Sequence, residues 1–432
     1  MAYDVLIIGA GAAGLAAARV LGASGLRVAV MEARDRAGGR VRFAEPVPGE
    51  TIELGAEFIH GPAVQTRALL AQTGGVADSR EGDGWIQAAP GAPLTLEEDE
   101  FLQAGALFAD IDALATDVTV DEYLATRRVA GVDPYAIERA RQFVEGFDAA
   151  DPARASARGI AREWNSGVDS LSARPSGGYA PLIAALEGDA RDAGVDIRYS
   201  TPVIRIERSP SAVRVELASH ECVEARCAIV SLPIGVLRSA SVLFVPQLPD
   251  QTRNAIAHIA MGDVARVVLL FRTPFWESIA GGRYRDAGFF RAADGPFRAY
   301  WTQHPHRRRS IVAWSGGPDA RQLLQQSREN LVHAAVAGFG ALFGCPERAL
   351  AEFEDAAVHD WSADPYARGA YSYLLVGGES AREQLAAPVQ GTLYFCGEAT
   401  APDGEGGTVN GAISSGERAA REVLAELART KT

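Results

Sequence analysis

The chain has 432 residues, of which 47% are hydrophobic and 22% are charged, and its formal net charge is -13 at pH 7. This length favours two domains, and the balance of residues is that of a globular protein with a sizeable core. The acidic excess disfavours nucleic acid or an anionic membrane as a partner, and it either attracts cationic substrates mildly or serves solubility alone.

Cys222, Cys227, Cys345 and Cys396 have no metal-ligand spacing, so we expect reduced thiols and no metal site. The first residues, MAYDVLIIGAG, lack the basic segment of a signal peptide. No uncharged apolar run approaches the roughly 20 residues of a membrane helix. We therefore expect a cytoplasmic protein, and the sequence predicts no particular oligomeric state.

The N-terminal segment has the pattern of a strand, a helix and a second strand. Residues 3–8 form a short apolar run that ends at glycine, which is typical of a buried parallel strand. The Ala-rich residues 12–21 favour a helix, and residues 27–31 favour the next strand. Together they predict a βαβ unit.

A glycine pattern lies between the first strand and the helix. Gly9, Gly11 and Gly14 match GxGxxG: they allow a tight turn, close approach of a pyrophosphate, and close packing of helix on strand, respectively. Phosphates would lie at the N–H groups that begin the helix. Glu32 ends the second strand, where a carboxylate accepts hydrogen bonds from an adenosine ribose.

The residues after Glu32 favour FAD over NAD. Residues 33–41 read ARDRAGGRV, which resembles the RxGGR element of the glutathione-reductase-like FAD fold. Its glycines permit close backbone approach, and its arginines can neutralise a diphosphate. No second GxGxxG follows, so we expect no separate NAD(P)H site.

The middle of the chain is predicted to be helical first and then rich in strands. We expect helices within residues 94–128, 134–147 and 181–193. Short runs at 196–199, 203–207, 213–217 and 222–226 favour an antiparallel meander, and 228–232 favours a buried strand. Residues 266–271 open a second β-rich region, followed by helices within 320–343, a strand at 393–396 and a last helix at 409–427.

Four further blocks accompany the glycine pattern and the RxGGR element. They are ELGAEFIHGP at 53–62, residues 203–207 with AIVSLPIGVL at 228–237, WSADPYARGAYSY at 361–373, and FCGE at 395–398 with GTVNGA at 407–412. The six blocks together resemble the flavin-containing amine oxidase family of polyamine oxidases, monoamine oxidases and lysine-specific histone demethylases, and they occur in family order.

The resemblance implies an α/β fold in which a glutathione-reductase-like FAD-binding Rossmann domain is joined to an α+β substrate domain. We expect the FAD-binding domain to comprise residues 1–78, 196–246 and 388–432. The substrate domain would comprise residues 79–195, its helical part, and residues 247–387, its sheet and further helices.

The resemblance also implies the residues that contact FAD. Thr408 and Val409 would open the last helix, whose N–H groups face the flavin C2 carbonyl and stabilise negative charge there. Glu398 would accept a hydrogen bond from a ribityl or ribose hydroxyl. The full expected set is Gly9, Gly11, Ala12, Ala13, Gly14, Glu32, Ala33, Arg34, Gly39, Arg40, Gly55, Ala56, Glu57, Phe58, Val203, Ser231, Trp361, Tyr366, Gly397, Glu398, Gly407, Thr408, Val409 and Ala412.

The expected catalytic residues are Arg266, Tyr371, Trp361, His60, Glu57 and Thr408, and the sequence departs from the family at three positions. Trp361 and Tyr371 would form the walls of the amine pocket, where an aromatic face favours a cation. Ala370 stands where monoamine oxidases have the cysteine that bonds to the flavin, so FAD should be noncovalent. Thr408 stands where those enzymes have a second tyrosine. Arg266 stands where the family has a lysine that holds a water at flavin N5, and it either supplies a fixed positive charge there or points elsewhere.

Two further residues in the third block each have two interpretations. His60 either lies beside a substrate channel or is a satisfied structural histidine. Glu57 is either a channel carboxylate for a cationic amine or a solvated acid in a turn.

The predicted reaction is hydride transfer from the amine-bearing carbon of a small molecule to flavin N5, with oxygen as acceptor. Three alternatives stay open. They are a desaturase or dehydrogenase of a non-amine substrate, an amino-acid oxidase, which needs an arginine facing the substrate carboxylate, and a flavin-bound interaction protein without turnover.

Overall fold

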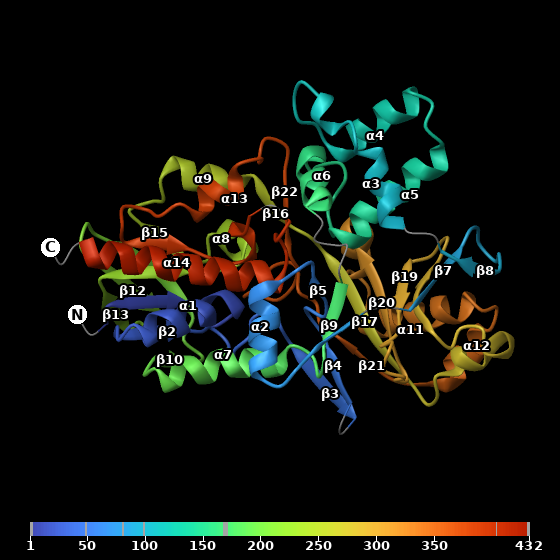
Figure 1. Ribbon diagram of the computed structural model, residues 1–432, viewed down its shortest axis with the longest axis horizontal. Coiled ribbons are helices and arrows are strands. Elements are labelled where there is room, and N and C mark those ends of the chain that lie inside the picture. The colour runs from blue at the N-terminus through green and yellow to red at the C-terminus, as the bar shows by residue number, and fades with distance from the viewer. Residues whose placement is uncertain are drawn as a thin grey trace.

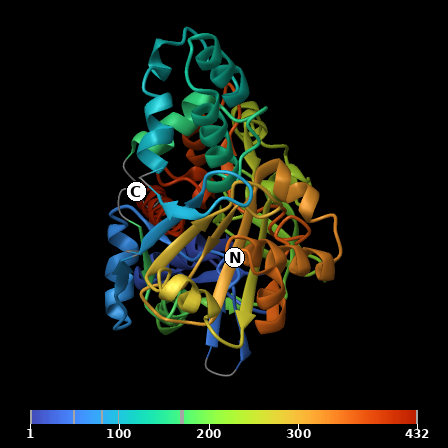
Figure 2. The same cartoon turned by 90° about the vertical axis from the view of Figure 1, so that its right-hand side faces the viewer.

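The computed structural model describes residues 3–47, 50–79, 82–97, 100–166, 172–402 and 404–429. A five-stranded sheet with its helices lies at the left of Figure 1, and a seven-stranded sheet lies at the right. A helical segment between residues 100 and 165 stands above the seven-stranded sheet, as the turned view in Figure 2 also shows.

The five-stranded sheet is parallel and has the order β10-β2-β1-β14-β23. Three of its strands consist of buried, mostly β-branched residues, because a parallel sheet is covered on both faces. Its strands are β1 (Val5–Ile8), β2 (Val28–Met31), β10 (Asp196–Arg198), β14 (Cys227–Val230) and β23 (Leu393–Phe395).

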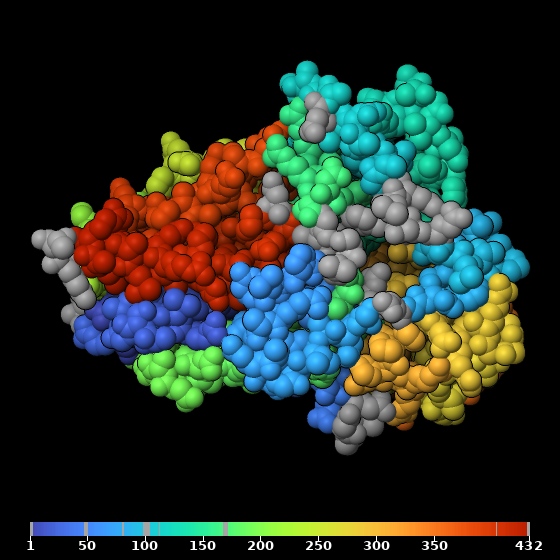
Figure 3. All heavy atoms as spheres, in the orientation of Figure 1, coloured from blue at the N-terminus to red at the C-terminus, as the bar shows by residue number. Residues whose placement is uncertain are grey.

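Side chains alternate along β1, so its two faces pack on different layers. Val5 and Ile7 pack against the helices α1 (Ala12–Ala23), α7 (Ala180–Asp192) and α14 (Val409–Arg429). In Figure 3 the blue surface of α1 lies beside the red surface of α14. Leu6 and Ile8 face a second layer. It contains β11 (Val203–Arg208), β12 (Val213–Leu217), β13 (Cys222–Ala225), β15 (Leu243–Val245), α8 (Ile234–Arg238), α9 (Asp250–Ala257) and α13 (Ala381–Ala386).

The seven-stranded sheet has the order β21-β17-β20-β19-β18-β7-β8. Its strands are β7 (Asp83–Gln87), β8 (Leu94–Leu96), β17 (Val264–Phe271), β18 (Ala287–Arg291), β19 (Ala299–Trp301), β20 (Ser310–Gly316) and β21 (Phe353–Val358). One face of β17 packs against the helices α10 (Gly317–Leu323), α11 (Arg328–Ala341) and α12 (Pro346–Glu352) through residues such as Val267 and Leu269. Val268 and Leu270 face the opposite way, and the strand period of two places Arg266 on that same face.

The helical segment comprises α3 (Glu100–Leu107), α4 (Val120–Val129), α5 (Pro134–Phe147) and α6 (Ala157–Asn165). Its helices begin at capping residues: Thr119 forms a capping box with Glu122, and Asp133 and Ser156 cap α5 and α6. The chain then returns through β9 (Ser172–Pro175), which pairs with β5 (Ile59–His60) and β6 (Ala77–Ser79). The remaining elements are α2 (Val64–Gln72), the hairpin β3 (Phe43–Val47) with β4 (Glu50–Glu53), the pair β16 (Ile259–Met261) with β22 (Ser372–Leu374), and 3₁₀ helices at Ile111–Ala113, Phe275–Gly281 and Glu398–Thr400.

The α/β fold predicted from the sequence is confirmed, with two corrections. Residues 94–96 form strand β8 rather than part of a helix, because they pair with β7 at the edge of the sheet. Residues 196–198 pair with β2 in the parallel sheet rather than joining the antiparallel meander. The helix α7 precedes this strand and packs on α1, which is the crossover that parallel strands require.

The domain limits stay a prediction. The packing of α7 on α1 favours starting the second FAD-binding segment before residue 180 rather than at 196. Among the described residues, no helix has both the length and the apolar character needed to cross a membrane.

Candidate active site

A cavity of about 1590 Å³ runs between the two sheets and under the helical segment. This volume exceeds the roughly 300–1,000 Å³ of a typical small-ligand site, so it has room for a dinucleotide and a second molecule. It is lined by all the sequence-predicted site residues except Gly14. Gly14 serves packing, as predicted, because a Cβ there would lie 1.9 Å from the Gly9 carbonyl oxygen.

The start of α1 fits a diphosphate. Gly11 is the N-cap and provides no side-chain hydrogen bond, so the first N–H groups of the helix are free of a side-chain cap. A Cβ at Gly11 would meet no atom within 4 Å, and one at Gly39 would lie 3.4 Å from the Gly11 Cα. The two glycine-rich backbones therefore lie against each other, with Gly38 N–H donating to the Ala10 carbonyl at 2.9 Å, and the space above Gly11 stays open, which fits a diphosphate.

Glu32 fixes the adenosine end of this cradle. Its carboxylate is 4% exposed and accepts the Ala10 N–H at 2.6 Å and the Arg34 N–H at 2.8 Å. Each carboxylate oxygen accepts one N–H, from Ala10 or from Arg34, which leaves further lone pairs for a ribose hydroxyl. Glu32 thus both holds the glycine turn and presents an acceptor to the cavity.

The arginines of the RxGGR element have different roles. Arg36 donates to the carbonyls of Ala37, Gly39 and Val41 and braces the loop, and it does not line the cavity. Burial, with the nearby charges of Arg34 and Arg42, lowers the pKa of Arg36. Arg34 and Arg40 do line the cavity, but each already pairs with a carboxylate, Asp364 at 2.6 Å and Glu398 at 2.9 Å. Arg36 is therefore held by backbone carbonyls of its own loop, and the expectation that these arginines neutralise a diphosphate stays a prediction.

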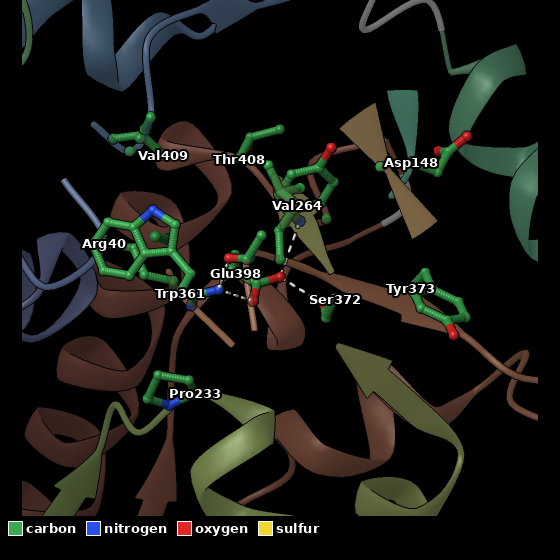
Figure 4. Close-up of a pocket in the computed structure, with 18 of the residues that line it drawn as sticks. Arg40, Asp148, Pro233, Val264, Trp361, Ser372, Tyr373, Glu398, Thr408 and Val409 are labelled. Atoms are coloured by element: carbon green, nitrogen blue, oxygen red, sulfur yellow. Dashed lines mark hydrogen bonds and ion pairs between the residues drawn. The ribbon is translucent and has the colours of Figure 1, made fainter. Parts of the chain in front are cut away.

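Glu398 lies at the centre of a buried network, with Arg40 and Ser372 on either side (Figure 4). It accepts from Ser372 Oγ at 2.6 Å and from the Gly407 N–H at 3.0 Å. Arg382 donates to Ser372 Oγ at 2.9 Å and pairs with Glu163 of α6 at 3.3 Å. Burial alone would raise the pKa of Glu398, but Arg40 and Arg382 hold it below its usual range. The sequence motif located Glu398, whereas Arg382 carries no local signal and was missed.

The start of α14 also faces the cavity. Thr408, Val409 and Ala412 line it. The Thr408 hydroxyl accepts the Gly411 N–H at 2.9 Å and donates to the Glu405 carbonyl at 2.8 Å, so it is occupied by capping the helix. The helix N-terminus, rather than this hydroxyl, is what the segment offers a ligand.

Aromatic side chains form the part of the cavity beyond the dinucleotide cradle. Trp361 donates to the Leu54 carbonyl at 2.9 Å, and Tyr371 donates to the Phe147 carbonyl at 2.6 Å, so both ring orientations are fixed. His60 also lines this region, with its ring centroid 5.9 Å from that of Phe147. The other aromatic residues of this region are Phe58, Phe143, Phe147, Trp164, Phe289, Trp301, Trp314 and Tyr373. Tyr366 also lines the cavity, but its ring lies beside Arg34 at the adenosine end. We call this region the aromatic chamber.

Arg266 lies in the wall of the same cavity and pairs with Glu57. Its Nη2 is 2.5 Å from Glu57 Oε2, and its Nη1 donates to the Gly55 carbonyl at 3.2 Å. Glu57 also accepts from Arg174 at 2.8 Å, Trp301 and Gln303. Burial alone would raise the pKa of Glu57, but Arg266 and Arg174 hold it at about 2.

These contacts resolve one ambiguity in the sequence. The interpretation of Glu57 as a solvated turn acid is wrong, because Glu57 is 5% exposed and satisfied by four side chains. Arg266 lies in the cavity wall, and its role as a fixed positive charge near the flavin stays a prediction. The chain's single lysine, Lys431, lies outside the described residues.

Glu53, a partly buried acid that acts on this pair, makes stability depend on pH. One oxygen accepts the Tyr179 N–H at 2.7 Å, and the other has no hydrogen-bond partner among the described residues. Burial, opposed by that N–H and by Arg266, raises the pKa of Glu53 from 4.5 to about 7. The folded protein then keeps a proton that the unfolded chain releases, so stability falls as pH rises from 4.5 to about 7 and stays lower above that.

The variant Glu53→Gln removes this titration while keeping the acceptor for Tyr179. We expect its Tm to fall less than that of the wild type between about pH 5 and pH 8. Over this range the wild type should lose up to about 3 kcal/mol more unfolding free energy than the variant. Thermal unfolding of both proteins across this range measures the difference. Parallel curves would contradict a raised pKa at Glu53.

Noncovalent attachment of FAD stays a prediction. Ala370 lines the cavity and contributes no sulfur. Acid precipitation of the yellow holoprotein should therefore release all the flavin into the supernatant, whereas colour in the pellet would contradict the prediction.

Comparison with known proteins agrees with this geometry. The family model described as flavin containing amine oxidoreductase matches residues 106–424, and a model of an NAD(P)-binding Rossmann-like domain matches residues 7–73. Human lysine-specific histone demethylase 2 is 28% identical over 98% of the chain, but the chain spans only 53% of that protein. Polyamine oxidase 4 of Oryza sativa subsp. japonica is 27% identical over 97% of the chain and 88% of its own length.

Solved structures share the fold. Cyclohexylamine oxidase from Brevibacterium oxydans superposes with a TM-score of 0.82 at 22% identity, over 99% of this chain and 100% of that one. A putrescine oxidase bound to putrescine superposes with a TM-score of 0.82 at 23% identity, over 98% and 99% of the two chains. At these identities the likeness establishes the architecture.

Proposed function

Because the chain belongs to the flavin-containing amine oxidoreductase family, we propose that it oxidises the C–N bond of a small amine to an imine, with oxygen as electron acceptor. The chain is a flavin-dependent oxidoreductase and its cofactor is FAD. The observation that carries the proposal is the single continuous cavity, which joins the dinucleotide cradle at Gly11 and Glu32 to the aromatic chamber at Trp361 and Tyr371.

The chemistry that FAD supplies when bound is acceptance of a hydride from the carbon that carries the amine. The protein's contribution is to place that carbon. Trp361 and Tyr371 are each anchored by a hydrogen bond to a backbone carbonyl, so their faces form rigid walls for an amine. A rigid orientation lowers the entropic cost of reaching the reactive geometry, and an aromatic face attracts a positively charged amine.

The aromatic chamber also limits access of water. Phe58 packs against Trp301 with ring centroids 5.7 Å apart, and Phe289 stacks on Trp301 at 5.5 Å. Across the chamber, Phe143 stacks on Phe147 at 5.2 Å. These apolar walls favour a substrate with a hydrocarbon body, and they protect an imine from hydrolysis until it leaves.

Three arginines of the lining are already paired with acids of the protein, which disfavours an amino acid as substrate. An amino-acid oxidase needs an arginine that faces the substrate carboxylate. Arg139 and Arg291 pair with Glu97 at 3.1 and 2.9 Å, and Arg298 pairs with Asp319 at 3.4 Å. A substrate carboxylate would have to compete with the protein's own acids for these guanidinium groups.

An anaerobic substrate screen tests the proposal. The holoenzyme is mixed without oxygen with monoamines, diamines and cyclic amines, and with alcohols and carboxylic acids of the same carbon skeletons. We expect amines to bleach the visible absorbance of the flavin and the matched alcohols and acids to leave it unchanged. Bleaching by non-amines alone would contradict amine oxidation, and bleaching by no compound would favour an interaction protein without turnover.

The variant Tyr371→Ala tests the wall of the pocket. We expect it to bind FAD as the wild type does, because the Tyr371 hydroxyl donates to the Phe147 carbonyl of α5, which is not part of the dinucleotide cradle. Loss of the ring should slow reduction of the flavin by the best amine about tenfold or more, because the reacting carbon is less well oriented. Stopped-flow absorbance without oxygen measures this rate, and wild-type kinetics would place Tyr371 outside the site.

A further inference from the structure

Two buried arginines share one buried carboxylate beside the cavity. Arg174, from β9, donates from Nε to Glu57 Oε1 at 2.8 Å. Its Nη1 and Nη2 donate to the carbonyls of His304 and Thr302, each at 2.9 Å, and its guanidinium lies 4.6 Å from the ring centroid of Phe58. Arg174 is 7% exposed and does not line the cavity. Every nitrogen of this side chain is held, so its position is rigid.

Arg266 is the member of this cluster that reaches the cavity. It is 5% exposed, and its Nε is buried without a hydrogen-bond partner among the described residues. Its partner Glu57 divides its two oxygens between the two guanidinium groups. Trp301 and Gln303, which also donate to Glu57, are neutral.

The charges of the cluster leave one positive charge uncompensated. Arg174 and Arg266 are always charged, and Glu57 is ionised at neutral pH. Glu53 also acts on Arg266 and Glu57, and it is largely protonated below about pH 7. Without Arg174, Glu57 would balance Arg266 alone and the wall would be neutral. A net charge in a dry cavity wall acts over several ångströms more strongly than it would in water.

We propose that Arg174 is a positioning residue that, by sharing Glu57, keeps a net positive charge at the Arg266 wall and thereby makes bound FAD easier to reduce. The inference rests on the proposed function, which places the flavin against this wall. A positive charge stabilises the electron-rich state of a bound group, and Arg174 provides it without touching that group.

The experiment measures the equilibrium constant for reduction of the FAD in the holoenzyme against a reference dye, at about pH 6. The variants are Arg174→Gln, Arg174→Lys, Glu57→Gln and Arg266→Gln. Arg158→Gln is the control, because Arg158 is a partly buried arginine of α6 that pairs with Glu379 away from the cluster. Thermal unfolding and FAD affinity are recorded for each protein.

We expect Arg174→Gln to lower the reduction constant about tenfold, which for a two-electron couple equals about 30 mV. Arg174→Lys should restore most of the loss, because it restores the charge. Glu57→Gln should raise the reduction constant, because it removes the negative charge of the cluster. This variant tests the inference even where Arg174→Gln fails to fold. Arg158→Gln should match the wild type.

Two outcomes separate this inference from the proposed function. A normal reduction constant in Arg174→Gln with a lowered one in Arg266→Gln would show that Arg174 is only structural and would overturn the inference. Normal constants in both variants would show that the flavin does not lie against Arg266, and the proposed arrangement of the site would then fail as well.

Discussion

Replacing Glu32 by alanine is expected to weaken FAD binding by about 10-fold to 100-fold. The carboxylate is buried, accepts one N–H from each of the two loops of the cradle, and keeps lone pairs for the ribose. A hydrogen bond to a charged acceptor typically contributes about 1.5–3 kcal/mol. Alanine removes this contribution and also releases the turn at Ala10.

Titration of apoprotein with FAD, followed by flavin fluorescence, measures this loss. Glu32→Gln should fall between alanine and the wild type, because the amide keeps one acceptor oxygen. Asp35→Ala removes an exposed carboxylate three residues further along and should bind FAD normally. Unchanged affinity in Glu32→Ala would show that Glu32 does not hold the ribose.

Replacing Arg266 by methionine is expected to slow reoxidation by oxygen about tenfold or more, and to slow reduction by substrate much less. Reduction depends mainly on the placement of a C–H bond, which the aromatic walls control. Transfer of negative charge to oxygen is helped by a nearby positive charge, which Arg266 supplies at the cavity wall. Methionine leaves Glu57 paired with Arg174, so no buried charge is left without a partner.

Stopped-flow measurement of the two half-reactions separates these effects. Arg266→Lys should preserve or raise the oxygen rate, because it keeps a compact charge near the same place. If Arg266→Met reoxidises at the wild-type rate, Arg266 does not take over the role of the family's lysine, and the alignment of β17 with the flavin is wrong.

The sequence predicted the cofactor cradle well because its elements are local. The turn at Gly9, the N-terminus of α1 and the carboxylate of Glu32 follow from residues within one βαβ unit, and the structure brings them together. The late motif around Glu398 was recognisable for the same reason. Strand β8 was missed because its three residues are held by pairing with β7, and a run this short has no period of its own.

The charge arrangement of the site could not be predicted because it depends on tertiary packing. Glu57 and Arg174 are separated by 117 residues, and Glu57 and Arg266 by 209. No local pattern marks Arg174 or Arg382 as partners of buried acids. The sequence placed Arg266 and Glu57 in the site, but only the fold shows that Glu57 pairs with both Arg266 and Arg174.

The most direct test of the account is a single turnover of the holoenzyme with one equivalent of the best amine, without oxygen. We predict that reduction of one flavin consumes one amine. We also predict one equivalent of an imine, recovered as an amine that carries one deuterium on the oxidised carbon after trapping with borodeuteride or, after hydrolysis, as a carbonyl compound with the released nitrogen fragment. Reduction of the flavin with the C–N bond of the amine recovered intact and unoxidised would contradict the central claim that this protein oxidises an amine.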